Sequence, residues 1–285
     1  MNKMKRLILT TSTAIAMTFT GCVTGNSQRD CIVGPAFDTL IAHRGESFDA
    51  PENTLPAYRM AVERGFGFEC DIYRSADGRL FTFHDSKLTR TSGGRFTNAC
   101  VNASWEREVS KLDVGGWGKW KDSKYVGTRP ALFEEVLALA RPGRKIYVEV
   151  KGGDAAVDWV QQIKKVVDKE PKATPDTILF ICFSAKTCKA LKTAMPDFKV
   201  YWLTGEKLRP EEIITVLHET HADGVDIRYR GELHTAEFIE KIKASGYEFH
   251  IWTIDDPETA KEAFQRGVQT VTTNRAKFIL EMLNK

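Results

Sequence analysis

Residues 67–84 read GFECDIYRSADGRLFTFH, and this stretch decides the fold of the chain. Two strand-like runs, Gly67–Tyr73 and Arg79–His84, are separated by the turn residues Ser75–Gly78. A parallel crossover needs about a dozen residues, so the second run must return as the antiparallel arm of a β-hairpin. It therefore adds no strand to a parallel sheet.

Outward from this hairpin, strand-like runs alternate with segments of helical period, as in a parallel α/β sheet. Eight runs remain when the hairpin arm is set aside: Thr39–His43, Gly67–Tyr73, Lys145–Lys151, Ile178–Ser184, Lys199–Leu203, Gly224–Arg228, Glu248–Ile254 and Thr270–Thr273. The helical segments between them are Asn53–Arg64, Leu132–Ala140, Ala155–Lys169, Ala185–Met195, Pro210–Glu219, Thr235–Ser245 and Pro257–Arg266. Eight parallel strands in about 250 residues predict an α/β fold of the (β/α)8 TIM-barrel type, with the active site at the C-terminal strand ends. An open doubly wound sheet is the alternative, although no G-x-G-x-x-G or P-loop sequence follows any strand.

Residues 86–129 form a long stretch without a clear helix or strand period. We expect them to be an insertion after the second strand and its hairpin. Long insertions in compact domains usually act as lids or binding loops. This one should lie beside the catalytic face of a barrel domain spanning residues 37–285.

Residues 1–21 read as a signal peptide. Lys3, Lys5 and Arg6 precede an apolar run that is too short and too polar to span a bilayer. Removing these residues lowers the Lys+Arg count from 41 to 38, equal to the 38 Asp+Glu, so the remaining chain is formally neutral. A protein that binds nucleic acid by neutralising phosphates should be basic, so that class is excluded.

The residues Phe19-Thr20-Gly21-Cys22 resemble a bacterial lipobox, in which the cysteine is lipidated and becomes the new N-terminus. The polar residues 22–36 would then tether the barrel to a membrane. We therefore expect an exported lipoprotein anchored at Cys22, periplasmic or associated with the outer membrane. A plain secretory signal with an incidental Cys22 is the alternative.

The six cysteines include no C-x-x-C pair, which excludes zinc ribbons and thioredoxin-like chemistry. Lipidation of Cys22 would leave an odd number of cysteines, and so at least one free thiol. Cys70 and Cys182 lie in apolar strand runs, where a reduced cysteine packs as a small hydrophobe. Cys31 and Cys100 lie in loop-like segments and could pair, but the sequence does not establish a disulfide.

Carboxylates on two neighbouring strands are the first functional signal. Glu69 and Asp71 are two residues apart and point to the same face of one strand, and Glu149 and Lys151 repeat this arrangement on the next parallel strand. Converging carboxylates raise one another's pKa unless a cation neutralises them, and an all-oxygen set suits Mg²⁺, Ca²⁺ or Mn²⁺. The alternative is a salt-bridge network with the cations Arg44, Arg74 and Lys151.

Two histidines should reach the same barrel mouth, because His43 ends the first strand and His84 ends the hairpin arm. Two imidazoles on opposite sides of a bound group can serve as general base and general acid near neutral pH. Zinc held by two imidazoles and one carboxylate is a reasonable alternative, but three carboxylates already suit a hard cation. The remaining histidines are expected to be structural or solvated: His218, His221, His234 and His250.

Arg44 follows His43 directly, and with Lys151 it places two positive groups in the site. A divalent cation, an arginine and a lysine together spread the negative charge that develops on the oxygens of a phosphoryl group. This combination predicts phosphoester cleavage.

Five short motifs, in their order along the chain, resemble the glycerophosphodiester phosphodiesterase family. They are Ile41-Ala42-His43-Arg44-Gly45, Pro51-Glu52-Asn53-Thr54, Glu69-Cys70-Asp71, Phe83-His84-Asp85 and Val148-Glu149-Val150-Lys151. The likeness continues at Thr89–Thr91, Leu112–Trp117, Gly127–Pro130 and Trp252–Asp255, so it covers about residues 39–283.

This resemblance implies a TIM-barrel hydrolase that splits small glycerophosphodiesters into glycerol 3-phosphate and an alcohol. The residues to which it assigns roles are Glu69, Asp71 and Glu149 as ligands of one divalent cation, His43 and His84 as general base and acid, and Arg44 and Lys151 as phosphate-binding groups. Trp252 is a candidate for the substrate pocket.

Two departures from the family pattern stand out. The spacer Glu46–Ala50 is unusual, and Asn274 stands where the family commonly has Asp. Neither is expected to touch the site. Two other functions stay open: a lyase similar to bacterial phosphatidylinositol phospholipases C, which can work without a metal, and a lipid-anchored binding protein that has lost catalysis.

Overall fold

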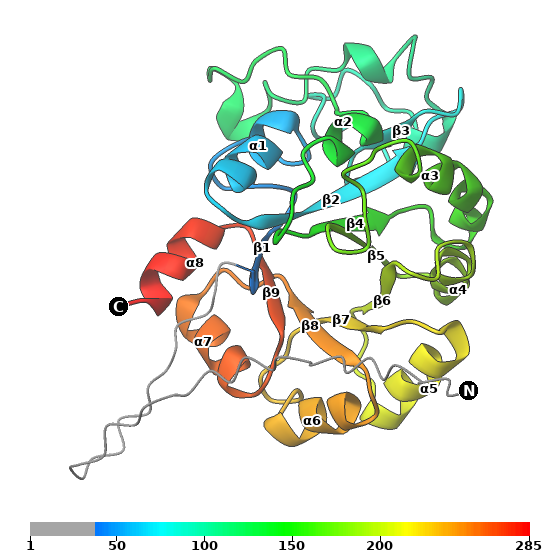
Figure 1. The fold of residues 1–285 in the computed structure, drawn as a ribbon. Coiled ribbons are helices and arrows are strands. Elements are labelled where there is room, and N and C mark those ends of the chain that lie inside the picture. The colour runs from blue at the N-terminus through cyan, green and yellow to red at the C-terminus, as the bar shows by residue number, and fades with distance from the viewer. Residues whose placement is uncertain (1–37) are drawn as a thin grey trace, which may run out of the picture. The chain divides into compact units, whose positions relative to one another are not determined.

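The computed structural model describes residues 38–285. Eight parallel strands close into a ring, because β2 pairs with β4 on one side and with β1 on the other (Figure 1). In order around the ring, the strands are β1 (Leu40–Ala42), β9 (Thr270–Thr273), β8 (Glu248–Trp252), β7 (Gly224–Arg228), β6 (Lys199–Thr204), β5 (Ile178–Cys182), β4 (Ile146–Val150) and β2 (Gly67–Arg74). The predicted (β/α)8 barrel is confirmed, and the open sheet is excluded.

The hairpin that decides the strand count is present. β3 (Leu80–Thr82) runs antiparallel to β2, with Ile72 opposite Thr82. Residues 86–129 contain no α-helix and no strand, only three short 3₁₀ turns, as expected for an insertion. Asp77 in the hairpin turn holds the insertion by accepting hydrogen bonds from Ser104 Oγ and the Trp105 backbone N–H, both 2.7 Å long.

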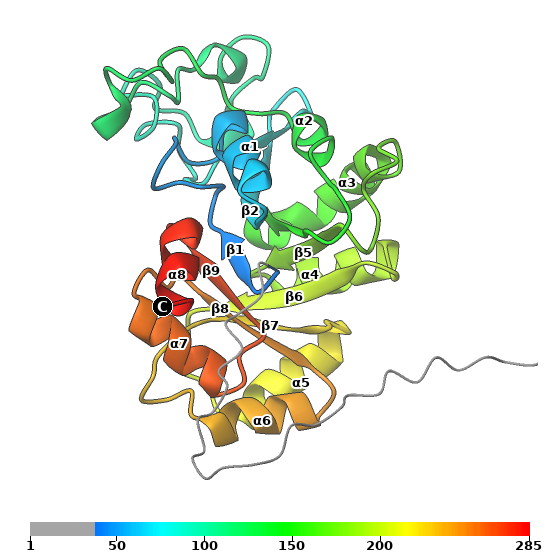
Figure 2. The same ribbon diagram turned by 60° about the vertical axis from the view of Figure 1, so that its left-hand side comes forward.

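Helices follow the parallel strands along the chain and lie around the ring in both views (Figures 1 and 2). They are α1 (Leu55–Glu63), α2 (Phe133–Leu137), α3 (Val160–Val167), α4 (Ala185–Ala194), α5 (Pro210–Thr220), α6 (Ala236–Ala244), α7 (Pro257–Gln265) and α8 (Ala276–Leu283). Ser184, Thr235 and Asp256 cap the N-termini of α4, α6 and α7 by accepting a backbone N–H. None of the helices within residues 38–285 is long and apolar enough to cross a membrane.

Two details differ from the sequence-based prediction. The predicted helix Ala155–Lys169 begins as a 3₁₀ helix, Gly153–Trp159, and becomes α3 only from Val160. Gly152, with φ of 90°, lies against the Trp159 ring, so the chain enters this segment through a tight left-handed turn. The final helix, α8, is not among the predicted segments.

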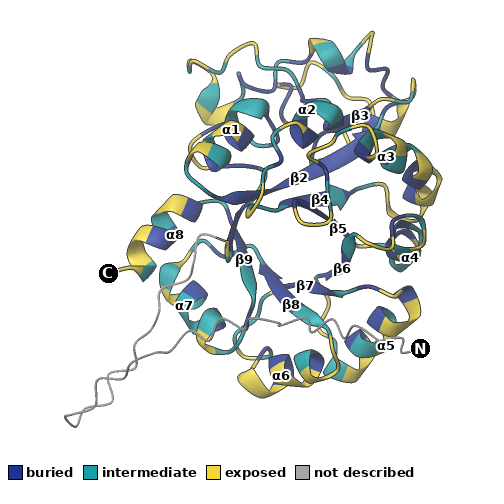
Figure 3. Ribbon diagram, in the orientation of Figure 1, coloured by how far each residue is buried: buried dark blue, intermediate teal, exposed yellow. Residues whose placement is uncertain are grey.

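Alternation along each strand separates two layers of packing. On β5, Phe180 and Cys182 belong to the core between the strands and the helices, whereas Leu179 and Ile181 belong to the cluster inside the barrel. Figure 3 shows the strands as mostly buried and the outer helix surfaces as largely exposed. Phe180 is completely buried, and its replacement by alanine would cost about 3–5 kcal/mol of folding stability.

Candidate active site

A cavity of about 190 Å³ opens at the C-terminal ends of the barrel strands. This is the end of the barrel at which the fold predicts an active site. It is lined by His43, Arg44, Glu69, His84, Glu149, Lys151, Ile181, Phe183, Leu203, Asp226, Trp252, Thr253 and Thr272. The structure therefore brings together seven of the eight barrel residues singled out from the sequence, and the eighth, Asp71, lies beside them on β2.

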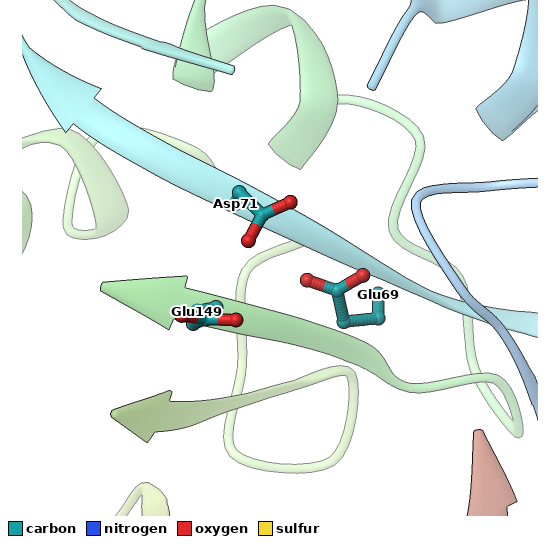
Figure 4. A group of neighbouring side chains, drawn as sticks. All are labelled: Glu69, Asp71 and Glu149. Carbon is teal, nitrogen blue, oxygen red and sulfur yellow. The ribbon is translucent and has the colours of Figure 1, made fainter. Parts of the chain in front are cut away.

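Three of these residues form a group of carboxylates. Glu69 and Asp71 lie on β2, Glu149 lies on the adjacent strand β4, and one oxygen of each falls within 4.8 Å of the others (Figure 4). Asp71 and Glu149 are direct neighbours in the parallel register of the two strands. Among residues 38–285, the group close enough to share a cation thus consists of three carboxylates and no imidazole.

The donor atoms of this group fit a hard divalent cation. Oε1 of Glu69 and Oδ1 of Asp71 are buried and accept no hydrogen bond. Burial and the charge of Asp71 raise the pKa of Glu149 to about 8, and they also raise the pKa of Glu69 well above its ordinary value. Buried, unsatisfied carboxylate oxygens that repel one another are stabilised by a shared cation, and Mg²⁺ and Ca²⁺ prefer oxygen ligands.

Lys151 and Arg44 provide part of the alternative salt-bridge network. Lys151 Nζ lies 2.7 Å from Glu149 Oε1 and 3.3 Å from Asp71 Oδ1, and Arg44 Nε lies 3.6 Å from Asp71 Oδ2. Burial alone would raise the pKa of Asp71, but Lys151 and Arg44 outweigh it and hold this pKa below its ordinary value. Arg74 does not join them, because its Nε donates to Gln162 Oε1.

The turn that carries His43 and Arg44 is tied to β2. Arg44 has φ of 55°, and its backbone N–H donates to Glu69 Oε2 at 2.8 Å. Gly45 has φ of 78°, and a Cβ there would lie 2.6 Å from the backbone carbon of Ala57 in α1. Only glycine fits this close approach, which explains the glycine that follows the histidine and arginine.

His43 is held in one tautomer by a contact that the sequence analysis missed. Its Nδ1 lies 2.7 Å from Asn274 Oδ1, and Asn274 Nδ2 donates to the carboxylate of Asp255 at 2.7 Å. Because a carboxylate only accepts, the Asn274 amide must present its oxygen to His43, so Nδ1 donates and Nε2 carries the lone pair. Burial and then Arg44 lower the pKa of His43 to about 4. The expectation that Asn274 does not touch the site is wrong.

His84 belongs to a chain of charged groups reaching into the insertion. Its Nδ1 lies 2.8 Å from Asp85 Oδ1, and Arg90 donates to both oxygens of Asp85. Arg90 also donates to both oxygens of Glu52, whose Oε1 accepts from Arg44 Nη1 at 3.0 Å. The hydrogen bonds from Arg90 lower the pKa of Asp85 to about 2. One arginine of the insertion is therefore connected to both His84 and Arg44.

Of three further residues that line the cavity, only Trp252 was predicted from the sequence. Trp252, a predicted pocket residue, lines the cavity and makes an edge-to-face contact with Phe183 at 5.8 Å between ring centroids. Phe183 is 48% exposed and was not predicted. Asp226 was not predicted either; its Oδ1 is buried without a partner, and burial and then Glu149 raise its pKa to about 8. Its strand position between Val225 and Ile227 is the signal that could have identified it as barrel-facing.

The N-terminal predictions lie outside the described residues. They comprise the signal peptide at 1–21, the lipidation of Cys22 and the tether at 22–36.

Comparisons with known proteins agree with this geometry. The chain matches the model of the Glycerophosphoryl diester phosphodiesterase family over residues 43–277. It is 25% identical over 255 residues to a glycerophosphodiester phosphodiesterase of Caldanaerobacter subterraneus subsp. tengcongensis, which covers 86% of this chain and 98% of the relative. A glycerophosphodiester phosphodiesterase of Bacillus subtilis is 26% identical over 257 residues, with 85% of each chain covered.

Solved structures share the barrel. An Oleispira antarctica phosphodiesterase in complex with the product sn-glycerol-3-phosphate superposes with a TM-score of 0.77 at 23% identity, covering 87% of this chain and 98% of that chain. A glycerophosphodiester phosphodiesterase from Parabacteroides distasonis superposes with a TM-score of 0.71 at 23% identity, covering 88% and 98%.

Proposed function

The chain belongs to the glycerophosphoryl diester phosphodiesterase family, and we propose that it hydrolyses glycerophosphodiesters to glycerol 3-phosphate and an alcohol. The observation that carries this proposal is the cavity, where two histidines, two cationic side chains and three carboxylates meet at one barrel mouth. Two histidines with three carboxylates favour catalysis over a binding protein, and the carboxylate set disfavours the metal-free lyase.

His43 is the general base in this proposal. Its Nδ1 hydrogen is committed to Asn274, so Nε2 can accept a proton from the attacking water. The chain Asp255–Asn274–His43 holds the ring in place, since Asp255 also accepts the Asn274 backbone N–H at 2.8 Å.

His84 is the general acid. With its Nδ1 hydrogen donated to Asp85, its Nε2 hydrogen is available to the oxygen of the leaving alcohol. One water is consumed: its oxygen forms a new phosphorus–oxygen bond as the bond to the leaving alcohol breaks. His43 takes one proton from the water, and the alcohol takes the proton that His84 gives up.

Arg44 and Lys151 bind the phosphate. Arg44 Nε is buried without a hydrogen-bond partner, and Lys151 Nζ lies at the rim of the carboxylate group, so both can donate to phosphoryl oxygens. Glu69, Asp71 and Glu149 would hold a divalent cation, which would supply further positive charge to stabilise the phosphoryl group, with Mg²⁺ or Ca²⁺ preferred and Mn²⁺ a third choice.

The glycerol end of the substrate lies deep in the cavity, and the alcohol points outward past Phe183 and Trp252. Phe183, which is 48% exposed, packs edge-to-face against the partly buried Trp252 and forms the more exposed rim, so the alcohol makes few polar contacts. Choline, ethanolamine and glycerol should therefore be accepted within about tenfold of one another in kcat/KM, because weak rim contacts change transition-state binding by about one kcal/mol.

The function is tested by incubating the protein with glycerophosphocholine and identifying the products by mass, with the His84→Ala variant as the control for contaminating activity. Glycerol 3-phosphate and choline are expected. Phosphocholine with glycerol would mean that the wrong bond is cut. A cyclic glycerol phosphate as the final product would support the lyase.

We also propose that the protein is an exported lipoprotein, located in the periplasm or associated with the outer membrane. The support is the lipobox-like sequence at Phe19–Cys22. In bacterial expression the wild type should partition with membranes and Cys22→Ser should not. An unmodified Cys22 in the intact mass would contradict the anchor.

A further inference from the structure

Two buried thiols lie side by side outside the proposed catalytic machinery. Cys182 is the last residue of β5, and Cys188 lies in the first half of α4. Their Sγ atoms are 2.8 Å apart, and both side chains are completely inaccessible to solvent. The side chain of Cys182 belongs to the layer between the barrel and the helices, the same layer that contains Cys188.

Neither thiol has a hydrogen-bond partner stronger than the other thiol. Cys188 Sγ reaches the Cys182 carbonyl at 3.4 Å, and Cys182 Sγ reaches the Ser184 carbonyl at 3.6 Å. A thiol is a weak donor, so these contacts leave the two sulfurs as the closest partners. No Cys182–Cys188 metal site is indicated either, because the group able to hold a cation within residues 38–285 contains only carboxylates.

The other two described cysteines have no such neighbour. Cys70 lies on β2 between two carboxylate residues, and Cys100 Sγ contacts the Asp85 carbonyl at 3.1 Å. Neither has a hydrogen-bond or sulfur contact to another cysteine within residues 38–285. Burial raises the pKa of the Cys100 thiol to about 12, so in the folded protein this thiol is a poor nucleophile for disulfide exchange.

We propose that Cys182 and Cys188 form a disulfide bond in the exported protein. A disulfide-donating thiol oxidoreductase forms a mixed disulfide with one cysteine during folding, before α4 covers the strand. The thiolate of the second cysteine then attacks that sulfur, forms the S–S bond and releases the donor as its dithiol. The two cysteines lose two protons and two electrons, which the donor disulfide takes up.

This bond would hold the β5–α4 turn next to the cavity. The turn contains Phe183, which lines the cavity, and Ser184, which caps α4 and donates to Asp154 Oδ1 at 2.6 Å. A disulfide across so short a loop stabilises the fold mainly by restricting the unfolded chain. Because both sulfurs are buried, the folded protein should resist reduction by small thiols.

The test uses the full-length protein and mass spectrometry, so its result does not depend on phosphodiesterase activity. Reduced, denatured protein is refolded with oxidised and reduced glutathione, then denatured and alkylated without reduction. A peptide pair linked through Cys182 and Cys188 is expected, with Cys70 alkylated. The same linkage is expected in protein secreted to the periplasm of a bacterium.

Matched variants complete the test. Cys100→Ser should retain the linked peptides, and Cys188→Ala should leave Cys182 alkylated. Wild-type protein refolded in the presence of strong reductant should have a thermal midpoint about 4–8 °C below that of the oxidised protein, and the same treatment should leave the midpoint of the Cys182→Ala/Cys188→Ala double variant unchanged. Alkylation of both Cys182 and Cys188 after oxidative refolding, or a linkage of Cys182 to any other cysteine, would overturn the proposal.

Discussion

Replacing Arg90 by methionine should weaken catalysis although Arg90 does not line the cavity. The guanidinium makes four hydrogen bonds, two to Asp85 and two to Glu52, with lengths of 2.7–2.9 Å. Methionine keeps much of the apolar stem and removes all four. Asp85, without Arg90, then no longer holds His84 in one orientation. Glu52 loses Arg90 as its second partner, so its contact with Arg44 is no longer limited.

The structure sets the size of both effects. Arg90 is 38% exposed, so each ion pair is screened by solvent and contributes at most about 1 kcal/mol. Two carboxylates lose a partner, so the free energy of unfolding should fall by about 1–2 kcal/mol. Misorientation of the two site residues should lower kcat/KM by about 10–100-fold, less than the loss of His84 itself.

The assay measures kcat and KM for glycerophosphocholine together with the thermal midpoint. A positioning role predicts a fall mainly in kcat, partial recovery in Arg90→Lys, and a smaller Arg90→Met effect when His84 is already alanine. Arg95→Met is the matched control, because Arg95 is exposed on the same insertion and lies outside the described ion pairs. A folded Arg90→Met variant with kcat/KM within twofold of the wild type would refute the reasoning.

The other predictions concern the histidines. His43→Ala and His84→Ala should each lower turnover by about 10²–10⁴-fold in folded protein, and near-normal turnover in steady-state assays of either would remove its assigned role. His234 is buried outside the site, accepts the Arg230 backbone N–H through Nδ1, and has its pKa lowered from 6.5 to about 4 by burial and then by Arg230. The folded state therefore resists protonation, so its contribution to stability is complete above pH 6.5 and is lost as the pH falls towards 4, by up to about 3 kcal/mol. His234→Asn keeps an acceptor for Arg230 and should flatten this slope in urea titrations between pH 6.5 and 4, whereas an unchanged slope would assign the acid sensitivity to other groups.

Local spacing explains which parts of the fold the sequence predicts. The short Ser75–Gly78 turn forces a hairpin, and the two-residue period of β2 places Glu69 and Asp71 inside the barrel. The same period along β4 and the residue that follows it places Glu149 and Lys151 on one face, and the parallel register of the two strands brings Glu149 beside Asp71.

Long-range contacts explain what the sequence does not predict. His43 and Asn274 are 231 residues apart, and their contact depends on ring closure between β1 and β9. Arg90 comes from an irregular insertion that has no period from which its direction could be inferred. Cys182 and Cys188 lie on a strand and on the following helix, so neither the strand period nor the helix period relates their side chains.

In the proposed reaction, a cation bound by Glu69, Asp71 and Glu149 supports diester hydrolysis at this barrel mouth. The most direct measurement is the rate of glycerophosphocholine hydrolysis by protein treated with EDTA, dialysed, and then supplied with Mg²⁺ or Ca²⁺. We predict that chelation abolishes hydrolysis, that at least one of the two cations restores it, and that Glu69→Gln shows no restoration. Full activity in metal-free protein would contradict the account and favour the salt-bridge network of Lys151 and Arg44 in its place.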